Sequence, residues 1–282
     1  MFKKQIFFLL AIVSVICFSC KSEDETPTNN DNGGTLPTEY QLVWSDEFDG
    51  ATINKDNWSF VLWEAGKVNN EWQKYVESPD NYKVENGLLH IIATKTGDNN
   101  FDGYTSTRLS SQKKKEFSYG RFEFRAKMPN GKGTWPALWM LGSNIDQVGW
   151  PKCGEIDIME YVGYLPNTTH SNIHTQYQYG NTDFHASINL DTAEEDFHIY
   201  GIIWTKDKIQ FYVDNITNIT NTYSPSNKNS DNWPFTQSYF FIMNFAVGGA
   251  WGGIEGVDGD TWPQTMIVDY VRVYQLRPIK ND

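Results

Sequence analysis

The chain has 282 residues, of which 15% are aromatic and 21% are charged, and its formal net charge at pH 7 is −12. This aromatic content excludes a coiled coil, a collagen-like chain and an acidic disordered protein. The negative charge disfavours nucleic acid, and also anionic lipid, as a partner bound through charge. Many aromatic side chains with few charges favour a neutral ligand with flat apolar faces, and carbohydrate has that form.

Residues 1–20 are predicted to be an export signal. Lys3 and Lys4 precede an apolar run from Ile6 to Phe18, which is too short to span a bilayer as a helix. The run ends in Ser19-Cys20, which resembles a bacterial lipoprotein cleavage site, where the cysteine becomes the lipid-bearing first residue. We therefore expect an exported lipoprotein of the outer membrane or cell surface, attached to the membrane only through a lipid on Cys20. The alternative is an ordinary secretory signal and a secreted protein.

Residues 21–38 are dense in Thr, Asn, Pro and Gly and contain no apolar run, which predicts a flexible tether. Residues 39–277 contain no polar linker near their middle and are predicted to form a single domain that acts as a monomer. Cys153 is the only cysteine in this domain, so no internal disulfide can form and the core must supply the stability. No partner pattern supports a catalytic role for this thiol.

From residue 40 onward the dominant hydrophobic period is two, which is typical of β-strands. Alternating or apolar runs bounded by turn residues predict strands at 88–93, 119–127, 199–204, 208–213, 239–246 and 267–274. In the last of these, Ile267, Val271 and Val273 are expected to share one face. No amphipathic helix of ten residues or more is evident. The expected fold is all-β, a single sandwich or jelly roll.

Three carboxylates occur in the segment 154–163, Gly-Glu-Ile-Asp-Ile-Met-Glu-Tyr-Val-Gly. Glu155 and Asp157 are two apart, so on a strand they point to one face, and the isoleucines that alternate with them point to the other. Glu160 has the wrong parity for that face. One extra residue, a β-bulge around Met159, would return Glu160 to it.

Three carboxylates on one face cannot all be ionised without electrostatic repulsion, because like charges a few ångströms apart raise at least one pKa. A retaining glycosidase needs one ionised and one protonated carboxyl group about 5–5.5 Å apart. Side chains of Glu155 and Glu160 that lean toward each other can close a Cα separation of roughly 13 Å to that distance. A solvated acidic strand edge and a calcium site are the alternatives.

Aromatic and polar residues flank the acidic segment. Trp135 and Trp139 fall on the same face of the preceding strand, roughly 13 Å apart, and as a pair they favour stacking on sugar rings over core packing. Downstream, alternation places five polar residues on one face: His170, Asn172, His174, Gln176 and Gln178. A helix would bring the two histidines together as metal ligands, but a strand separates them by about 13 Å, so a hydrogen-bonding wall is favoured.

These residues resemble the active-site signature of glycoside hydrolase family 16. The run 150–163 is similar to the bulged E-x-D-x-x-E form found in laminarinases, the endo-1,3-β-glucanases of the family. The similarity continues through segments 43–48, 120–123, 135–139, 173–175 and 268–274. It implies a β-jelly roll of two curved antiparallel sheets with a substrate groove on the concave face. It also implies retaining endo-hydrolysis of 1,3-β-glucosidic linkages in laminarin-type β-glucans, through a covalent glycosyl-enzyme intermediate.

The resemblance also implies roles for individual residues. Glu155 is expected to be the nucleophile and Glu160 the acid/base, with Asp157 between them as the auxiliary residue, hydrogen-bonded to the nucleophile. Trp135 and Trp139 are expected to line the negative subsites, with His174 near the acid/base. Looser matches to substrate-binding positions are Asn70, Glu71 and Arg108, and further platforms, with core packing as the alternative, are Trp150 and Trp251.

Many relatives hold a structural calcium ion on the convex side, and here its ligands would be Glu47, the carbonyl of Gly87 and Asp269, all oxygens.

Rival functions remain: a mixed-linkage 1,3-1,4-β-glucanase, a galactanase of the agarase or carrageenase type, transglycosylation, and a non-catalytic glucan-binding lipoprotein. The extra residue Met159 disfavours the mixed-linkage branch, and the acidity of the chain disfavours a sulfated galactan. The intact set of three carboxylates disfavours a protein that only binds.

Overall fold

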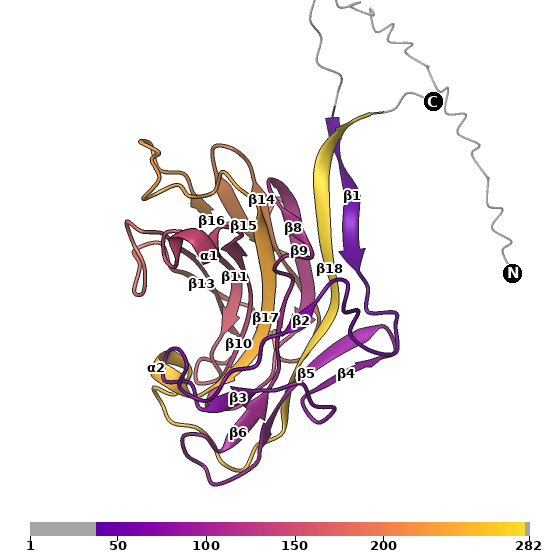
Figure 1. Ribbon diagram of the computed structural model, residues 1–282, viewed down its shortest axis with the longest axis vertical. Coiled ribbons are helices and arrows are strands. Elements are labelled where there is room, and N and C mark those ends of the chain that lie inside the picture. Colours follow the sequence, from indigo (N-terminus) through magenta and orange to yellow (C-terminus); the bar gives the residue numbers. More distant parts are fainter. Residues whose placement is uncertain (1–37, 280–282) are drawn as a thin grey trace, which may run out of the picture. The chain divides into compact units, whose positions relative to one another are not determined.

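The computed structural model describes residues 38–279, which form two β-sheets packed face to face (Figure 1). The strands of the ten-stranded sheet are β1 (Thr38–Asp46), β3 (Gln73–Tyr75), β4 (Tyr82–Glu85), β5 (Leu88–Lys95), β6 (Tyr104–Ser106), β9 (Gly120–Lys127), β14 (His198–Trp204), β15 (Ile209–Val213), β16 (Ile219–Tyr223) and β18 (Gln264–Pro278). They lie in the order β16-β15-β14-β9-β18-β5-β6-β3, with β1 beside β18 and β4 beside β5.

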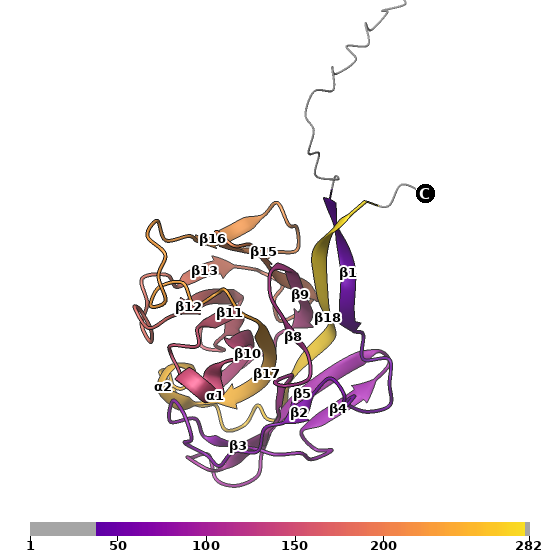
Figure 2. The same ribbon diagram turned by 45° about the horizontal axis from the view of Figure 1, so that its top comes forward.

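The second sheet has eight strands: β2 (Ser59–Phe60), β7 (Arg108–Ser110), β8 (Glu116–Phe117), β10 (Thr134–Gly142), β11 (Glu155–Tyr161), β12 (Thr168–His174), β13 (Ala186–Asn189) and β17 (Tyr239–Val247). Their order is β13-β12-β11-β10-β17-β7-β2, with β8 beside β17, and a second view shows β10 to β13 side by side (Figure 2). The long strands β10, β11 and β17 bend in the same sense, so this sheet has a concave face turned away from the ten-stranded sheet.

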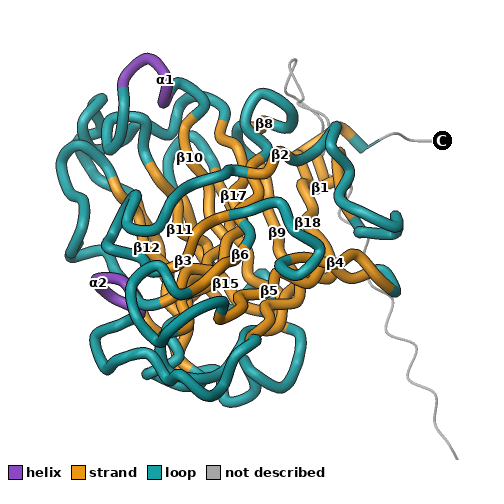
Figure 3. Tube along the Cα trace, turned by 60° about the horizontal axis from the view of Figure 1, so that its bottom comes forward, coloured by secondary structure: helices purple, strands orange, loops and turns teal. Residues whose placement is uncertain are grey.

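In the part of the chain that the structure describes, helical structure is confined to two single turns, α1 (Ile145–Val148) and α2 (Gly249–Gly252), which lie outside the strands (Figure 3). Within residues 38–279, no helix has the length and apolar character needed to cross a membrane. The predicted all-β jelly roll is confirmed, and all six predicted strands are present as β5, β9, β14, β15, β17 and β18.

Two details of the sheets differ from expectation. The pairing of β18 with β9 shifts register between Val268 and Tyr270, so β18 contains a bulge at this point. Because the bulge reverses parity, Val268 joins Val271 in the core, whereas Ile267 is half-buried on the other face; the predicted shared face of Ile267 with Val271 is therefore wrong. In addition, β3 pairs with β6 in parallel; the chain reverses between β4 and β5 and again between β5 and β6.

Aromatic side chains dominate the core between the sheets. Phe241 of β17 is fully buried, and the rings of five other aromatic residues lie within 6.4 Å of its own. They come from both sheets and from the connecting loops: Trp44, Trp58, Phe117, Phe122 and Phe124. Each such ring buries a large apolar area, so the core supplies stability without a disulfide.

The predicted export signal at 1–20 and the predicted tether up to residue 37 lie outside the described residues and stay predictions. Strand β1 begins at Thr38, the last residue of the predicted tether, and β18 ends at Pro278, one residue beyond the predicted end of the domain. These two strands pair with each other along their length.

Candidate active site

Strand β11 carries an extra residue where the sequence predicts a bulge. In its pairing with β10, Asp157 lies opposite Trp139 and Met159 lies opposite Leu138, so Ile158 has no partner. The same shift appears in the pairing of β11 with β12. The residues that face the core, among them Ile158 and Met159, are buried between the sheets. The bulge therefore turns Glu160 to the same face as the two preceding acids.

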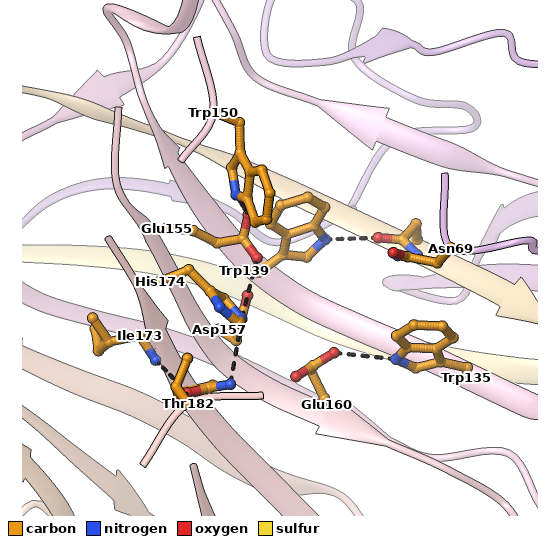
Figure 4. A network of polar contacts seen from close by, with 12 residues as sticks. Asn69, Trp135, Trp139, Trp150, Glu155, Asp157, Glu160, Ile173, His174 and Thr182 are labelled. Atoms are coloured by element: carbon orange, nitrogen blue, oxygen red, sulfur yellow. Dashed lines mark hydrogen bonds and ion pairs between the residues drawn. The ribbon is translucent and has the colours of Figure 1, made fainter. Parts of the chain in front are cut away.

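Glu155, Asp157 and Glu160 consequently lie together on the concave face, and we call them the acidic row (Figure 4). The carboxyl groups of Glu155 and Asp157 are close neighbours, and the charge of Asp157 acts directly on Glu155. His174 of β12 lies opposite Glu155, and its Nε2 is 3.0 Å from Oδ2 of Asp157 and 3.7 Å from Oε1 of Glu155. The imidazole thus spans the first two members of the row. The expected position of His174 beside Glu160 is wrong, because the register of β11 with β12 places His170 opposite Glu160.

Each end of the acidic row accepts a hydrogen bond from a different indole. Nε1 of Trp150 donates to Oε2 of Glu155 over 2.9 Å, and Nε1 of Trp135 donates to Oε1 of Glu160 over 3.1 Å (Figure 4). An indole N–H is a donor only, so it fixes one carboxyl oxygen without supplying a positive charge. Trp135 and Trp150, which were both predicted at the site, therefore contact the acidic row.

Burial raises the pKa of all three members of the acidic row. For Glu155 the charge of Asp157 adds to this effect, and for Asp157 the charge of Glu160 adds to it. For Glu160 the hydrogen bond from Trp135 opposes the rise. Within residues 38–279, no Lys or Arg forms a salt bridge with the row, and the charge of His174 opposes the rise in pKa for Glu155 and Glu160 only in part. Burial and mutual repulsion therefore favour a row that is not fully ionised.

Arg108 of β7 is buried between two indole rings. Its guanidinium lies 4.4 Å from the ring centroid of Trp63 and 4.8 Å from that of Trp139. Trp139 was predicted at the site, whereas Trp63 was missed because it lies outside any recognisable strand pattern. This stack holds both the cation and the Trp139 ring in place.

A buried network supports Trp139 from the other side. Nε1 of Trp139 donates to Oδ1 of Asn244 over 2.7 Å, and Nδ2 of Asn244 donates to the hydroxyl of Tyr75 over 3.0 Å. That hydroxyl donates to Glu71, which also accepts from Gln73 over 2.8 Å. Glu71 is thus buried beneath the site, and burial raises its pKa. Asn244 was missed, although a single amide inside the apolar run 239–246 is a recognisable signal.

Asn70 and Trp251 were also predicted to bind substrate. Asn70 is exposed with φ of 54°, and it is the neighbouring Asn69 whose side chain donates to Glu71, over 3.2 Å. Trp251 of α2 is half-buried, and its ring packs against Trp135 at 5.6 Å and His170 at 4.9 Å. Trp251 is thus packed beside the site and not in the core between the sheets, and its role as a platform stays a prediction.

The predicted polar wall is present only along β12. His170, Asn172 and His174 are buried on its concave side, but the strand ends at His174. Beyond it Gln178 turns away and donates to Asp183 over 2.9 Å, so the expected continuation of the wall through Gln176 and Gln178 is wrong. Burial lowers the pKa of His170 to about 4, which keeps this imidazole neutral at neutral pH.

Among residues 38–279, the one group of three His, Cys, Asp or Glu side chains with atoms close enough for a metal ion is Glu155, Asp157 and His174, within 4.8 Å of one another. The hydrogen bonds of the acidic row account for that proximity. Cys153 is buried without a disulfide in this part of the chain, and burial raises the pKa of its thiol to about 12, which opposes nucleophilic use.

The two carboxylates among the predicted calcium ligands already have partners. Glu47 accepts two hydrogen bonds from Arg272, at 2.9 and 2.8 Å, and Asp269 accepts one from Arg125 at 2.5 Å. The oxygen donors have the chemistry that calcium prefers, but as arranged they do not fit the ion unless these ion pairs open. The calcium site stays a prediction.

A jelly-roll sandwich with a buried row of carboxylates held by indoles is the arrangement of an enzyme that hydrolyses carbohydrate. A family model described as glycosyl hydrolases family 16 matches residues 69–272. The chain is 41% identical over 251 residues to a β-glucanase of Rhodothermus marinus, covering 84% of this chain and 85% of that protein.

Solved structures agree with this match. A laminarinase from Flavobacterium sp. UMI-01 is 47% identical with a TM-score of 0.78, covering 83% of this chain and 100% of that chain. The laminarinase from Rhodothermus marinus is 39% identical with a TM-score of 0.79, covering 85% of this chain and 99% of that chain. The present chain therefore belongs to glycoside hydrolase family 16.

Proposed function

We propose that this protein is a retaining endo-1,3-β-glucanase that cleaves laminarin-type β-glucans through a covalent glycosyl-enzyme intermediate. The observation that carries the proposal is the acidic row, in which Glu155 and Glu160 flank Asp157 and each accepts a hydrogen bond from its own indole. Two carboxyl groups with separate environments are what a double-displacement mechanism requires. The likeness to laminarinases supports the choice of a 1,3-linked glucan.

In this proposal Glu155 is the nucleophile. One of its oxygens accepts from Trp150, and its carboxyl group lies beside that of Asp157. In the reactive state the proton lies on Asp157, so that Glu155 is ionised and the hydrogen bond from Asp157 stabilises the negative charge of the attacking group. Glu155 attacks the anomeric carbon and forms the glycosyl ester while the glycosidic bond breaks. His174 contacts both carboxyl groups and fixes their relative orientation.

Glu160 is the acid/base. Because burial raises its pKa, it keeps a proton to donate to the leaving glycosidic oxygen. After the leaving sugar departs, Glu160 accepts a proton from the water that hydrolyses the glycosyl ester, and both carboxyl groups return to their starting states. The hydrogen bond from Trp135 holds the Glu160 carboxyl group in one orientation through both steps.

Trp139 and Trp135 supply platforms for sugar rings on the concave face. Trp139 is half-buried, and its ring is fixed by Arg108 and Asn244, so little freedom is lost when a sugar stacks on it. Trp150 is 47% exposed beside Glu155 and supplies a third platform. Glu71 and Trp251 act by supporting these residues, and a contact between Asn70 and substrate stays a prediction.

A mixed-linkage 1,3-1,4-β-glucanase is the second candidate, because the same row and platforms can accept a chain in which some linkages differ. A sulfated galactan is disfavoured by the surroundings of the row: no Lys or Arg of the described residues pairs with it, and Arg108 is buried between two rings. A sulfate group would require exposed cationic partners.

The test is a reducing-sugar assay of residues 21–282 on laminarin, curdlan, lichenan, agarose and carrageenan, with the products sized and Glu160→Gln as the inactive control. We expect rapid release of short oligosaccharides from laminarin. Faster cleavage of lichenan than of laminarin would favour the second candidate. Cleavage of agarose or carrageenan alone would contradict the assignment to glucan.

Two further proposals rest on sequence resemblance. We propose that Cys20 carries a lipid that anchors the exported protein; labelled palmitate should enter the wild-type chain and not Cys20→Ala.

We also propose calcium binding by Glu47, Gly87 and Asp269, with Arg272 and Arg125 released. Chelation by EDTA should then lower the melting temperature and added calcium should restore it, whereas an unchanged melting temperature would contradict the site.

A further inference from the structure

Exposed aromatic side chains gather beside the Glu155 end of the acidic row. Among residues 38–279 four aromatic side chains are exposed: Phe101 at 51%, Trp150 at 47%, Tyr177 at 76% and Tyr179 at 51%. Three of the four come from two loops, one that precedes β11 and one that follows β12. Because Glu155 at the start of β11 pairs with His174 at the end of β12, both loops leave the same edge of the sheet, next to Glu155.

Trp150 links these loops to the acidic row. Its Nε1 donates to Glu155 over 2.9 Å, and its ring centroid lies 6.2 Å from that of His174. On the outer side, the ring of Tyr179 lies 5.3 Å from the Trp150 ring at an interplanar angle of 75°. Tyr177 is more exposed than Tyr179, but among the described residues its ring packs against no other aromatic ring. Tyr179 therefore continues the aromatic surface outward from the proposed nucleophile.

The loop that carries Tyr179 is held before any ligand arrives. Thr175 and Gln178 exchange two backbone hydrogen bonds, of 2.8 and 3.1 Å, which close a tight turn at the end of β12. The backbone N–H of Tyr177 donates to the carbonyl of Asp231 over 2.8 Å, which ties this turn to the loop that precedes β17. A platform that is already ordered loses little conformational entropy on binding.

We propose that Tyr179, together with the exposed part of Trp150, forms an additional sugar-binding subsite for 1,3-linked β-glucan at the Glu155 end of the row. The inference rests on the proposed function and names a residue that selects its substrate. The apolar faces of glucose rings stack on aromatic rings, and an exposed tyrosine offers such a face with little loss of side-chain freedom.

The angle between the two rings indicates which linkage the subsite selects. Platforms 75° apart require successive sugars to turn relative to each other. A 1,3-linked β-glucan winds into a helix and makes this turn, whereas a 1,4-linked β-glucan extends as a flat ribbon. Stretches of 1,3-linked sugar therefore contact both rings, and 1,4-linked stretches contact one.

The experiment measures kcat and KM of residues 21–282 on 1,3-β-gluco-oligosaccharides of increasing length, on laminarin and on lichenan. Tyr179→Ala removes the platform, and Tyr179→Phe keeps the ring without the hydroxyl. Tyr177→Ala is the matched control, because it removes a more exposed tyrosine from the same loop. We expect Tyr179→Ala to raise KM about 3- to 10-fold on the longer oligosaccharides and on laminarin, with kcat and the shortest cleaved oligosaccharide unaffected. Tyr179→Phe and Tyr177→Ala should match the wild type.

Equal values for Tyr179→Ala and wild type at every length would overturn the subsite. So would a loss that is the same at every length, since that indicates a structural role, or an equal loss in Tyr177→Ala. A loss on lichenan as large as that on laminarin would overturn the linkage selection. Failure of the wild type to cleave any 1,3-linked oligosaccharide would instead contradict the proposed function, so the two failures are separate.

Discussion

The two sheets of the sandwich surround their carboxylates with different partners. Glu47, which directly follows β1, accepts hydrogen bonds from Nε and Nη2 of Arg272. Asp269 of β18 accepts one from Arg125. The guanidinium beside Glu47 lowers the pKa of that carboxyl group. On the concave face of the other sheet the acidic row has indole N–H donors and an imidazole in place of guanidinium groups, and burial raises its pKa values.

This difference separates carboxylates that stabilise the fold from carboxylates available for chemistry. An acid paired with arginine stays ionised and has no proton to transfer. An acid buried among other acids and neutral donors costs stability but can exchange a proton near neutral pH. The following changes test this contrast, beginning with the largest expected effect.

Glu155→Ala should lower kcat on laminarin by roughly 10⁴-fold or more, because the covalent step has no substitute nucleophile. Azide should restore turnover of an activated aryl glycoside and give a glycosyl azide of α configuration, since azide enters from the face that Glu155 occupied. The anomeric configuration is measured by NMR. A β-configured azide would contradict the role assigned to Glu155.

Glu160→Ala should lower activity on laminarin by roughly 10²- to 10⁴-fold, yet retain most of the glycosylation step on an aryl glycoside whose leaving group needs no proton. The raised pKa of Glu160 places the basic limb of the wild-type kcat/KM profile above its ordinary pKa of 4.5. That limb should disappear in the variant. Unchanged activity on the polysaccharide would contradict a proton-donating role.

Glu155→Gln should stabilise the folded protein at pH 7 by about 1 kcal/mol or more. The pKa of Glu155 is raised on folding, so this group favours folding below its unfolded pKa and opposes it as the pH rises toward the folded pKa. The gain should therefore be present in urea unfolding at pH 7 and absent near pH 4. A loss of stability at pH 7 would show that the row does not carry the burial cost inferred for it.

Arg272→Met should destabilise the protein by about 0.5–1 kcal/mol, because it breaks a partly buried two-pronged ion pair and leaves Glu47 without its partner. Lys55→Met is the matched control, since the Lys55–Glu77 pair is more exposed and should contribute nothing measurable. Both are measured by urea unfolding at pH 7. Equal changes in the free energy of unfolding of the two variants would contradict the expected difference between the Arg272–Glu47 and Lys55–Glu77 ion pairs.

The part of the site that could be predicted is the part that depends on residues close together in sequence. Glu155, Asp157 and Glu160 lie within six residues of one strand, so period-two geometry and one bulge are enough to place them together. Trp135 and Trp139 follow from the same alternation on β10. The bulge in β18 was not predicted, because Ile267, Val271 and Val273 have the same parity in sequence and only pairing with β9 shows the shift between Val268 and Tyr270.

The sequence by itself determined the strands, the jelly-roll class and the three carboxylates, because each depends on residues that are close along the chain. Only the tertiary structure decided what holds them. Asn244 meets Tyr75 from 169 positions away, and Trp139 meets Asn244 from 105. The angle between Trp150 and Tyr179 depends likewise on how two separate loops pack. Such contacts arise from long-range strand pairing and side-chain packing, which no local period encodes.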